Sequence, residues 1–143
     1  MIVYSTYEVK MPVFSKRKIS AWIKLIASEY KKKVGEIAYI FCSDDKILEI
    51  NNEYLSHDYF TDVITFDYSY DNIISGDIFI STDTVRTNAI KFNVSYEKEL
   101  YRVIIHGILH LCGLEDNTKV KQIQMGKNED TTLNILYTKF LTK

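Results

Sequence analysis

The sequence predicts a single α+β domain spanning residues 1–143, in which a mixed four-stranded sheet packs with about five helices. Three observations lead to this fold class. A chain of 143 residues is long enough for one domain with a substantial core. Hydrophobic residues make up 46% of it, and no apolar run approaches the ~20 residues of a membrane span, which excludes disordered and membrane proteins. Strand and helix patterns follow one another in the order βαβαββααα.

The first half of the chain is expected to begin with a strand, a helix and a second strand. Residues 2–9 alternate loosely and are rich in β-forming side chains, which predicts the first strand. Ser15 is suited to cap a helix that runs to about Val34 and ends at Gly35. Residues 37–42 are almost continuously apolar, which is typical of a strand buried on both faces, so we place them in the centre of the sheet.

A second helix and a third strand come next. Asp44 can cap the helix, which runs to about Leu55 and is followed by a polar loop over residues 56–61. Residues 62–67 predict the third strand, and the polar residues 68–76 predict a hairpin loop. The strand after this loop is therefore expected to return beside the third one.

Residues 77–81 predict the fourth strand, as an antiparallel partner at the edge of the sheet. The first three strands, joined by helical crossovers, are expected to run mainly parallel. Three helices follow the sheet. A short one is predicted over about residues 82–92, and the last over about 118–137, where Gly126 weakens its middle.

The helix between these two carries the pattern around which the chain is organised. Ser95 is a suitable N-cap, and Gly113 is a natural residue for the turn after the last helical residue. His106 and His110 lie four residues apart, so they project from one face about 6 Å apart along the axis and can bind one metal ion. Asp116 can turn back as a third ligand. Burying two histidines without partners would be costly, which favours a metal site over two core histidines.

The spacing His-x3-His-x2-Gly-x2-Asp matches the metzincin zinc motif with two changes. Gly107 stands where those proteases carry the glutamate base, which argues against a zinc protease, and Asp116 stands where they carry a third histidine. A non-catalytic module with a structural metal would normally need four ligands, and Cys112 or Glu115 is the available fourth. Cys112 points away from the histidines on a regular helix. A non-haem iron site also uses two histidines and a carboxylate, but the sequence shows no pattern of the jelly-roll strands that usually carry such a site.

Composition gives weaker indications. Cys42 and Cys112 both lie in apolar stretches, and we interpret them as reduced and buried, as in a cytoplasmic protein. The N-terminus has no basic region or apolar core typical of a signal peptide. A formal net charge of −1 argues against a protein that coats nucleic acid non-specifically, although it allows a local basic patch.

Three segments together resemble one known family. Residues 106–116, which read His-Gly-Ile-Leu-His-Leu-Cys-Gly-Leu-Glu-Asp, resemble the metal motif of the YbeY family, the rRNA maturation endoribonucleases. Residues 50–54 with Asp58, followed by residues 61–66, resemble the family's Leu-Asn and Thr-Asp-Val-Leu-Ser-Phe segments. Residues 76–81 resemble its Gly-Asp-Ile-x-Ile-Ser strand. The three segments occur in family order, which makes the match specific.

The resemblance implies a zincin-like fold and a metal-dependent, single-strand-specific endoribonuclease with Zn²⁺ in its cleft. The implied role is 16S rRNA 3′ end maturation and ribosome quality control in the cytoplasm. The implied partners are single-stranded RNA of the small ribosomal subunit, with ribosomal proteins or assembly GTPases as further candidates, and neither DNA nor a membrane is expected. The cleft is expected to be bordered by residues 77–81 and by the loop that contains His57 and Asp58.

The chain departs from the family pattern at three positions. Asp116 replaces the usual third histidine, so Zn²⁺ would keep a net charge of about +1 instead of +2 and acidify its water less. Leu55 replaces an arginine that is thought to help catalysis, and His57 occupies a basic position two residues on. Arg102 is a candidate substitute, because it continues the line of His106 and His110 by one helical step. We therefore predict Arg102 and His57 as catalytic candidates; the alternative for Arg102 is a salt bridge to Glu99 or to an acid on the last helix.

Overall fold

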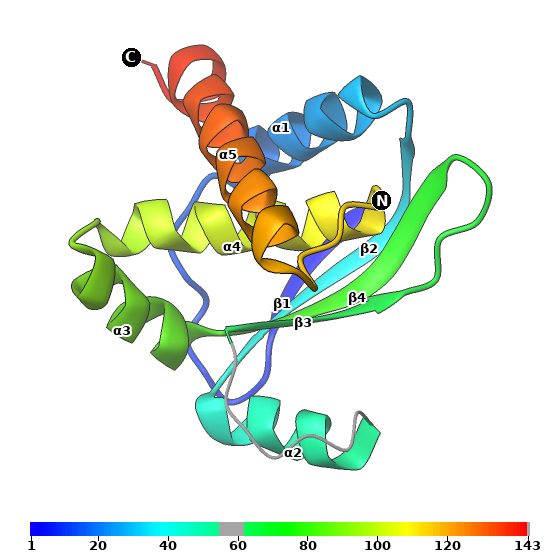
Figure 1. Cartoon of the computed structure of the whole chain (residues 1–143). Helices are drawn as coiled ribbons and strands as arrows, with labels where there is room; N and C mark the ends of the chain where they lie inside the picture. Colours follow the sequence, from blue (N-terminus) through cyan, green and yellow to red (C-terminus); the bar gives the residue numbers. More distant parts are fainter. Residues whose placement is uncertain (55–61, 143) are drawn as a thin grey trace.

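The structure, a computed structural model, describes residues 1–54 and 62–142. It confirms the α+β fold class, with a mixed four-stranded sheet and five α-helices among the described residues (Figure 1). The strands are β1 (Ile2–Thr6), β2 (Lys33–Cys42), β3 (Val63–Asp67) and β4 (Ile73–Ser81). The helices are α1 (Lys16–Glu29), α2 (Asp44–Tyr54), α3 (Thr82–Phe92), α4 (Tyr96–Leu111) and α5 (Lys119–Ile135), which a π-helical turn, η1 (Leu136–Phe140), continues.

The strand order is β1-β2-β4-β3, in which β2 pairs in parallel with both β1 and β4, and β3 pairs antiparallel with β4. The prediction that residues 77–81 form the edge strand is therefore wrong: they belong to β4, which has partners on both sides, and the antiparallel edge is β3. Isoleucines of β4, among them Ile74, Ile78 and Ile80, are buried, which suits an inner strand. Asp62 and Asp67 border β3 with charges that suit an exposed edge.

Several element boundaries also differ from the prediction; for example, β1 ends at Thr6 and not at residue 9, and β2 begins at Lys33 and not at residue 37. Helix α1 ends at Glu29 and not near Val34, because Lys31 adopts a left-handed backbone with φ of 60° and the chain then enters β2 at Lys33. The predicted hairpin loop over residues 68–76 is shorter, because β4 already begins at Ile73. The central position predicted for residues 37–42 is confirmed.

The two faces of the sheet are covered unequally (Figure 1). Helices α1, α4 and α5 lie on one face and enclose the main core, whereas α2 lies on the other face over a small cluster that includes Ile47, Ile50 and Ile64. Trp22 of α1 is fully buried, and its indole Nε1 donates to the Thr132 carbonyl of α5 at 2.9 Å. This hydrogen bond links α1 directly to α5.

The two cysteines are free thiols; Cys42 is buried as predicted, whereas Cys112 is half-buried. No helix in residues 1–54 and 62–142 combines the length and the apolar composition that crossing a membrane requires.

Candidate active site

Helix α4 places the two histidines above the sheet. The Ser95 side chain accepts a hydrogen bond from the Lys98 backbone at 3.0 Å, which confirms the predicted cap. Gly113, with φ of +103°, makes the predicted turn after the helix. Gly107 lies directly over Ile78 of β4, where an added Cβ would come within 3.0 Å of the isoleucine Cδ1. Helix α4 therefore packs closely against the sheet at Gly107.

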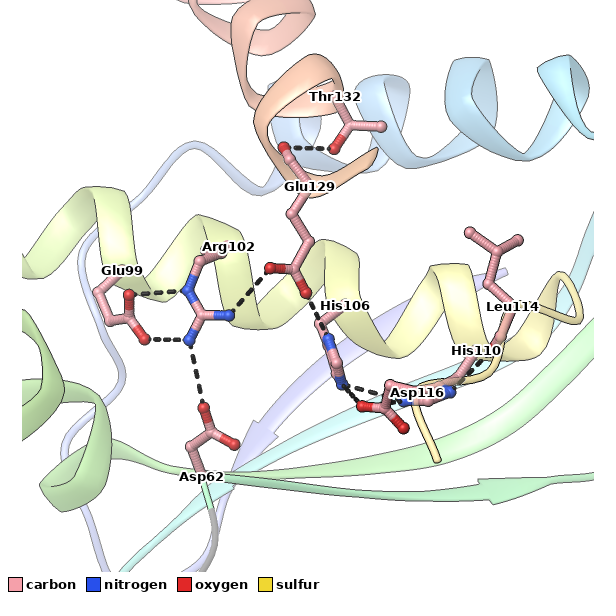
Figure 2. Close-up of polar contacts among 9 residues, drawn as sticks. All are labelled: Asp62, Glu99, Arg102, His106, His110, Leu114, Asp116, Glu129 and Thr132. Atoms are coloured by element: carbon pink, nitrogen blue, oxygen red, sulfur yellow. Dashed lines mark hydrogen bonds and ion pairs between the residues drawn. The ribbon is translucent and has the colours of Figure 1, made fainter. Parts of the chain in front are cut away.

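His106, His110 and Asp116 bring three ligand atoms together (Figure 2). The two histidine Nε2 atoms are 2.9 Å apart, and Asp116 Oδ2 lies 3.5 Å from His106 Nε2 and 3.4 Å from His110 Nε2. A triangle with these sides has a circumscribed radius of about 1.9 Å, so one ion can sit about 2.0–2.1 Å from all three atoms, the distance typical of zinc. The spacing of the three atoms thus fits a metal ion without rearrangement.

The outer nitrogen of each histidine has its own partner, and this sets the tautomer. His110 Nδ1 lies 2.9 Å from the Leu114 carbonyl, which can only accept, so Nδ1 carries the proton and Nε2 offers a lone pair. His106 Nδ1 lies 2.5 Å from Glu129 Oε2, a carboxylate on α5, and is fixed in the same way. Two imidazole lone pairs and one carboxylate therefore converge on one point, which is the chemistry of a cation site.

Burial alone would lower the pKa of His106, but the hydrogen bond to Glu129 and the charges of Glu129, Asp62 and Asp116 raise it above its ordinary value. In the metal-free chain, His106 Nε2 can therefore carry a proton and donate it in a hydrogen bond to His110 Nε2, 2.9 Å away. A divalent cation would take the place of that proton, so metal and proton are expected to compete for this site.

Arg102 lies one helical turn before His106 and contacts three carboxylates (Figure 2). It binds Glu99 through two hydrogen bonds, one of them 2.9 Å from Nε to Oε1, and its Nη1 donates to Glu129 Oε1 at 3.1 Å. Its remaining contact, to Asp62 Oδ2, is 3.5 Å long. Hydrogen bonding to Glu99 raises the pKa of Arg102 and outweighs its burial. The salt bridges that we considered as the alternative for Arg102 are therefore present.

A hollow of about 790 Å³ opens beside the three metal-ligand candidates. Strand β3 forms one wall, and Arg102, the histidines and the turn from Leu111 to Asp116 form the other. The predicted border at residues 77–81 is thus wrong, because the neighbouring strand β3 takes that place at the sheet edge. Leu55, His57 and Asp58 lie outside the described residues. Within the described part of the chain, neither Cys112 nor Glu115 joins the metal cluster.

Comparisons with known proteins identify the family of this chain. A family model described as endoribonuclease YbeY matches residues 4–137. The chain belongs to this family. It is similar to the endoribonuclease YbeY of Parabacteroides distasonis, with 55% identity over 135 residues, covering 94% of this chain and 95% of that protein. It is also similar to the endoribonuclease YbeY of Bacteroides fragilis, with 61% identity over 115 residues, covering 80% of this chain and 83% of that protein.

A solved structure shares the fold of this YbeY family chain. The solution structure of TM1509 from Thermotoga maritima superposes with a TM-score of 0.67 and 26% identity, over 96% of this chain and 89% of that one. The family match therefore assigns the chain to a family of RNA-cleaving hydrolases, and the solved structure shows the same fold.

Sequence reasoning missed Glu129 as a site residue of this YbeY family chain. The carboxylate is only 5% exposed and bridges Arg102 to His106 from a helix that begins beyond the histidine motif. A signal was present: Met125, Glu129 and Leu133 share the buried stripe of α5 at spacings of four residues. A carboxylate in an apolar stripe indicates a buried charged partner, which here is Arg102.

Proposed function

We propose that this protein is a metal-dependent, single-strand-specific endoribonuclease that holds one Zn²⁺ through His106, His110 and Asp116. The observation that carries the proposal is the convergence of three ligand atoms on one point at the edge of an open cleft. Three protein ligands are typical of catalytic zinc, which keeps a position open, whereas structural zinc is usually closed by four. Membership in an endoribonuclease family supports RNA as the substrate.

When bound, such an ion supplies Lewis acidity at a phosphodiester. The chain's own residues prepare the site for it. Leu114 and Glu129 hold the Nδ1 protons of His110 and His106, so both Nε2 lone pairs point into the cleft. Asp116 contributes the single negative charge of the ligand set. Its side chain is 38% exposed, against 17% for His106, so it forms the solvent side of the site.

Arg102 is proposed to contact the substrate phosphate from the wall of the cleft. Its bonds to Glu99 and Glu129 hold the guanidinium in place, and only the 3.5 Å contact to Asp62 faces β3. A phosphate oxygen can replace that long contact without disturbing the other two. His57 remains a predicted catalytic residue on sequence grounds alone.

The biological substrate is proposed to be rRNA of the small ribosomal subunit, with roles in 16S rRNA 3′ end maturation and ribosome quality control in the cytoplasm. Ribosomal proteins or assembly GTPases are the proposed protein partners. Family membership supports these proposals.

A zinc protease is the main competing function, and Gly107 argues against it. The position that carries the glutamate base in such proteases faces the sheet here, against Ile78 at 3.0 Å, so a side chain there has no access to the cleft. The absence of a glutamate at position 107 therefore has a physical reason, namely the close approach of α4 to β4.

The proposal is tested by metal analysis and cleavage assays on one preparation. We expect stoichiometric metal by mass spectrometry, cleavage of a labelled single-stranded RNA, loss of cleavage in EDTA with recovery on adding Zn²⁺, and little cleavage of the matching duplex or of casein. Asp116→Ala should lose the metal, whereas Glu115→Ala, a change of the neighbouring exposed carboxylate, should keep it. Undiminished RNA cleavage in EDTA, or equal cleavage of duplex, would contradict the proposal.

A further inference from the structure

The free edge of β3 carries a row of backbone groups that face away from the sheet. The Ser81 N–H donates to the Asp62 carbonyl and the Tyr68 N–H donates to the Ser75 carbonyl, both at 2.9 Å. In an antiparallel pair, hydrogen-bonded residues alternate with residues whose N–H and C=O point away from the partner. The even-numbered residues of β3 therefore bind β4, and the N–H and C=O groups of Val63, Thr65 and Asp67 point outward.

The residues that carry these outward groups border the cleft. Val63, Thr65 and Asp67 line the same hollow as the metal-ligand candidates. Among residues 1–54 and 62–142, no backbone hydrogen bond to the outward groups is present. Each of these residues offers a donor and an acceptor side by side, repeated every ~6.8 Å along the strand. The edge of β3 beside the cleft is thus a ladder of alternating backbone donors and acceptors.

The charges around this ladder select which part of an RNA can approach it. Asp62 and Asp67 lie at its two ends, and Glu115 lies across the hollow. Among the described residues that line the hollow, Arg102 carries the only guanidinium, and it is ion-paired with three carboxylates, those of Asp62, Glu99 and Glu129. A phosphate backbone lying along β3 would be repelled by Asp62 and Asp67, whereas uncharged nucleobases would not.

We propose that the outward N–H and C=O groups of Val63, Thr65 and Asp67 hydrogen-bond the edges of unpaired RNA bases next to the cleaved bond. This inference rests on the proposed function and deepens it by naming the part of the substrate that β3 recognises. The Watson–Crick edge of a base presents adjacent donors and acceptors, as the ladder does. In a duplex those edges are already paired, so β3 discriminates single-stranded from double-stranded RNA.

A second copy of the chain would bind the free edge of β3 less well than RNA bases. Two β3 strands that pair edge to edge would bring their terminal aspartates close together, and like charges across strands are destabilising. An extended polypeptide would also match the ladder, and the experiment below separates it from RNA.

The test removes one outward donor without touching the β3–β4 ladder. Proline is tolerated on an edge strand where its missing N–H faces away from the partner, so Thr65→Pro deletes the central outward N–H, and Thr65→Val keeps it. Binding is measured in the cold by fluorescence anisotropy with a labelled oligoribonucleotide, its duplex, and a version with abasic sites that keeps every phosphate. Thermal unfolding checks that both variants are folded.

We expect Thr65→Pro to bind the single strand about three- to tenfold more weakly than Thr65→Val, the effect of one hydrogen bond. The difference should vanish on the abasic probe. Equal affinities of the two variants for the single strand, or the same loss on both probes, would overturn the inference, and the first result is the one that a polypeptide occupant predicts. Failure of the wild-type chain to bind or cleave single-stranded RNA would instead reject the proposed function, and the inference with it.

A second measurement does not depend on the proline variant. In NMR spectra of the wild-type chain, adding the single-stranded RNA should shift the amide resonances of residues 63, 65 and 67, and should shift those of 64 and 66 much less. The opposite parity, or no shift at any of the five, would overturn the inference.

Discussion

Replacing Glu129 by glutamine should weaken metal binding through His106. The carboxylate accepts two hydrogen bonds, from Arg102 Nη1 at 3.1 Å and from His106 Nδ1 at 2.5 Å, and both partners are donors. A glutamine of the same shape has only one oxygen, so its amide N–H₂ must face one of these donors. A buried donor left without an acceptor costs about 1–3 kcal/mol, which we expect as the loss in the free energy of unfolding of the metal-free chain.

The same change should lower the affinity for Zn²⁺ by about 10–100-fold, the usual effect of removing the outer partner of a histidine ligand. Competition with a chromophoric chelator measures this affinity, and the NMR signal of the His106 ring reports its tautomer. The matched control is Asp130→Asn, the same loss of charge at the next residue of α5, which is exposed. If Glu129→Gln binds Zn²⁺ within about twofold of this control, the reasoning about His106 is refuted.

Three further predictions follow from individual side chains. Asp116→Ala should lose metal and RNA cleavage together, whereas Asp116→His should keep the metal and move the ascending limb of the pH–rate profile to lower pH, because a neutral ligand leaves the ion more positive; full metal content in the alanine variant would contradict this. Gly126→Ala should raise the free energy of unfolding by about 0.5–1 kcal/mol in denaturant titrations, since an added Cβ meets no atom within 4 Å; a loss of stability would be inconsistent with an open helix position. Burial raises the pKa of Cys42 to about 12, which keeps the thiol protonated at pH 8. Peptide mass spectrometry should therefore show alkylation of Cys42 at least about a hundredfold slower in the folded chain than in the denatured chain, and similar rates would disprove the burial argument.

Features that depend on neighbouring residues could be predicted from the sequence. Ser95 caps α4 and Gly113 ends it, as local backbone rules require, and helical spacing alone brings His106 and His110 together. The return of Asp116 to these histidines was also predictable, because only two residues separate it from the turn at Gly113. The resemblance to an endoribonuclease family rested on these same residues.

Features that depend on distant pairing could not be predicted in the same way. A β3–β4 hairpin can add to β2 through either strand, and the sequence pattern of residues 62–67 and 77–81 does not say which one is inside. In the structure β4 is the inner strand, and its buried Ile78 packs directly under Gly107 of α4. The end of α1 was misplaced for a different reason: Lys31 adopts the left-handed backbone that we assigned to a glycine further along.

The hydrogen bond between Trp22 and Thr132 makes the single indole an intrinsic fluorescent reporter of the candidate metal site. The chain has one tryptophan, so its emission comes from a single, fully buried indole. That indole is tied to α5 three residues after Glu129, the carboxylate that orients His106. Any detachment of α5 would expose the indole to water and release the imidazole in the same motion. A red shift of tryptophan emission should therefore accompany loss of the bound ion during unfolding, and it can be followed without a label.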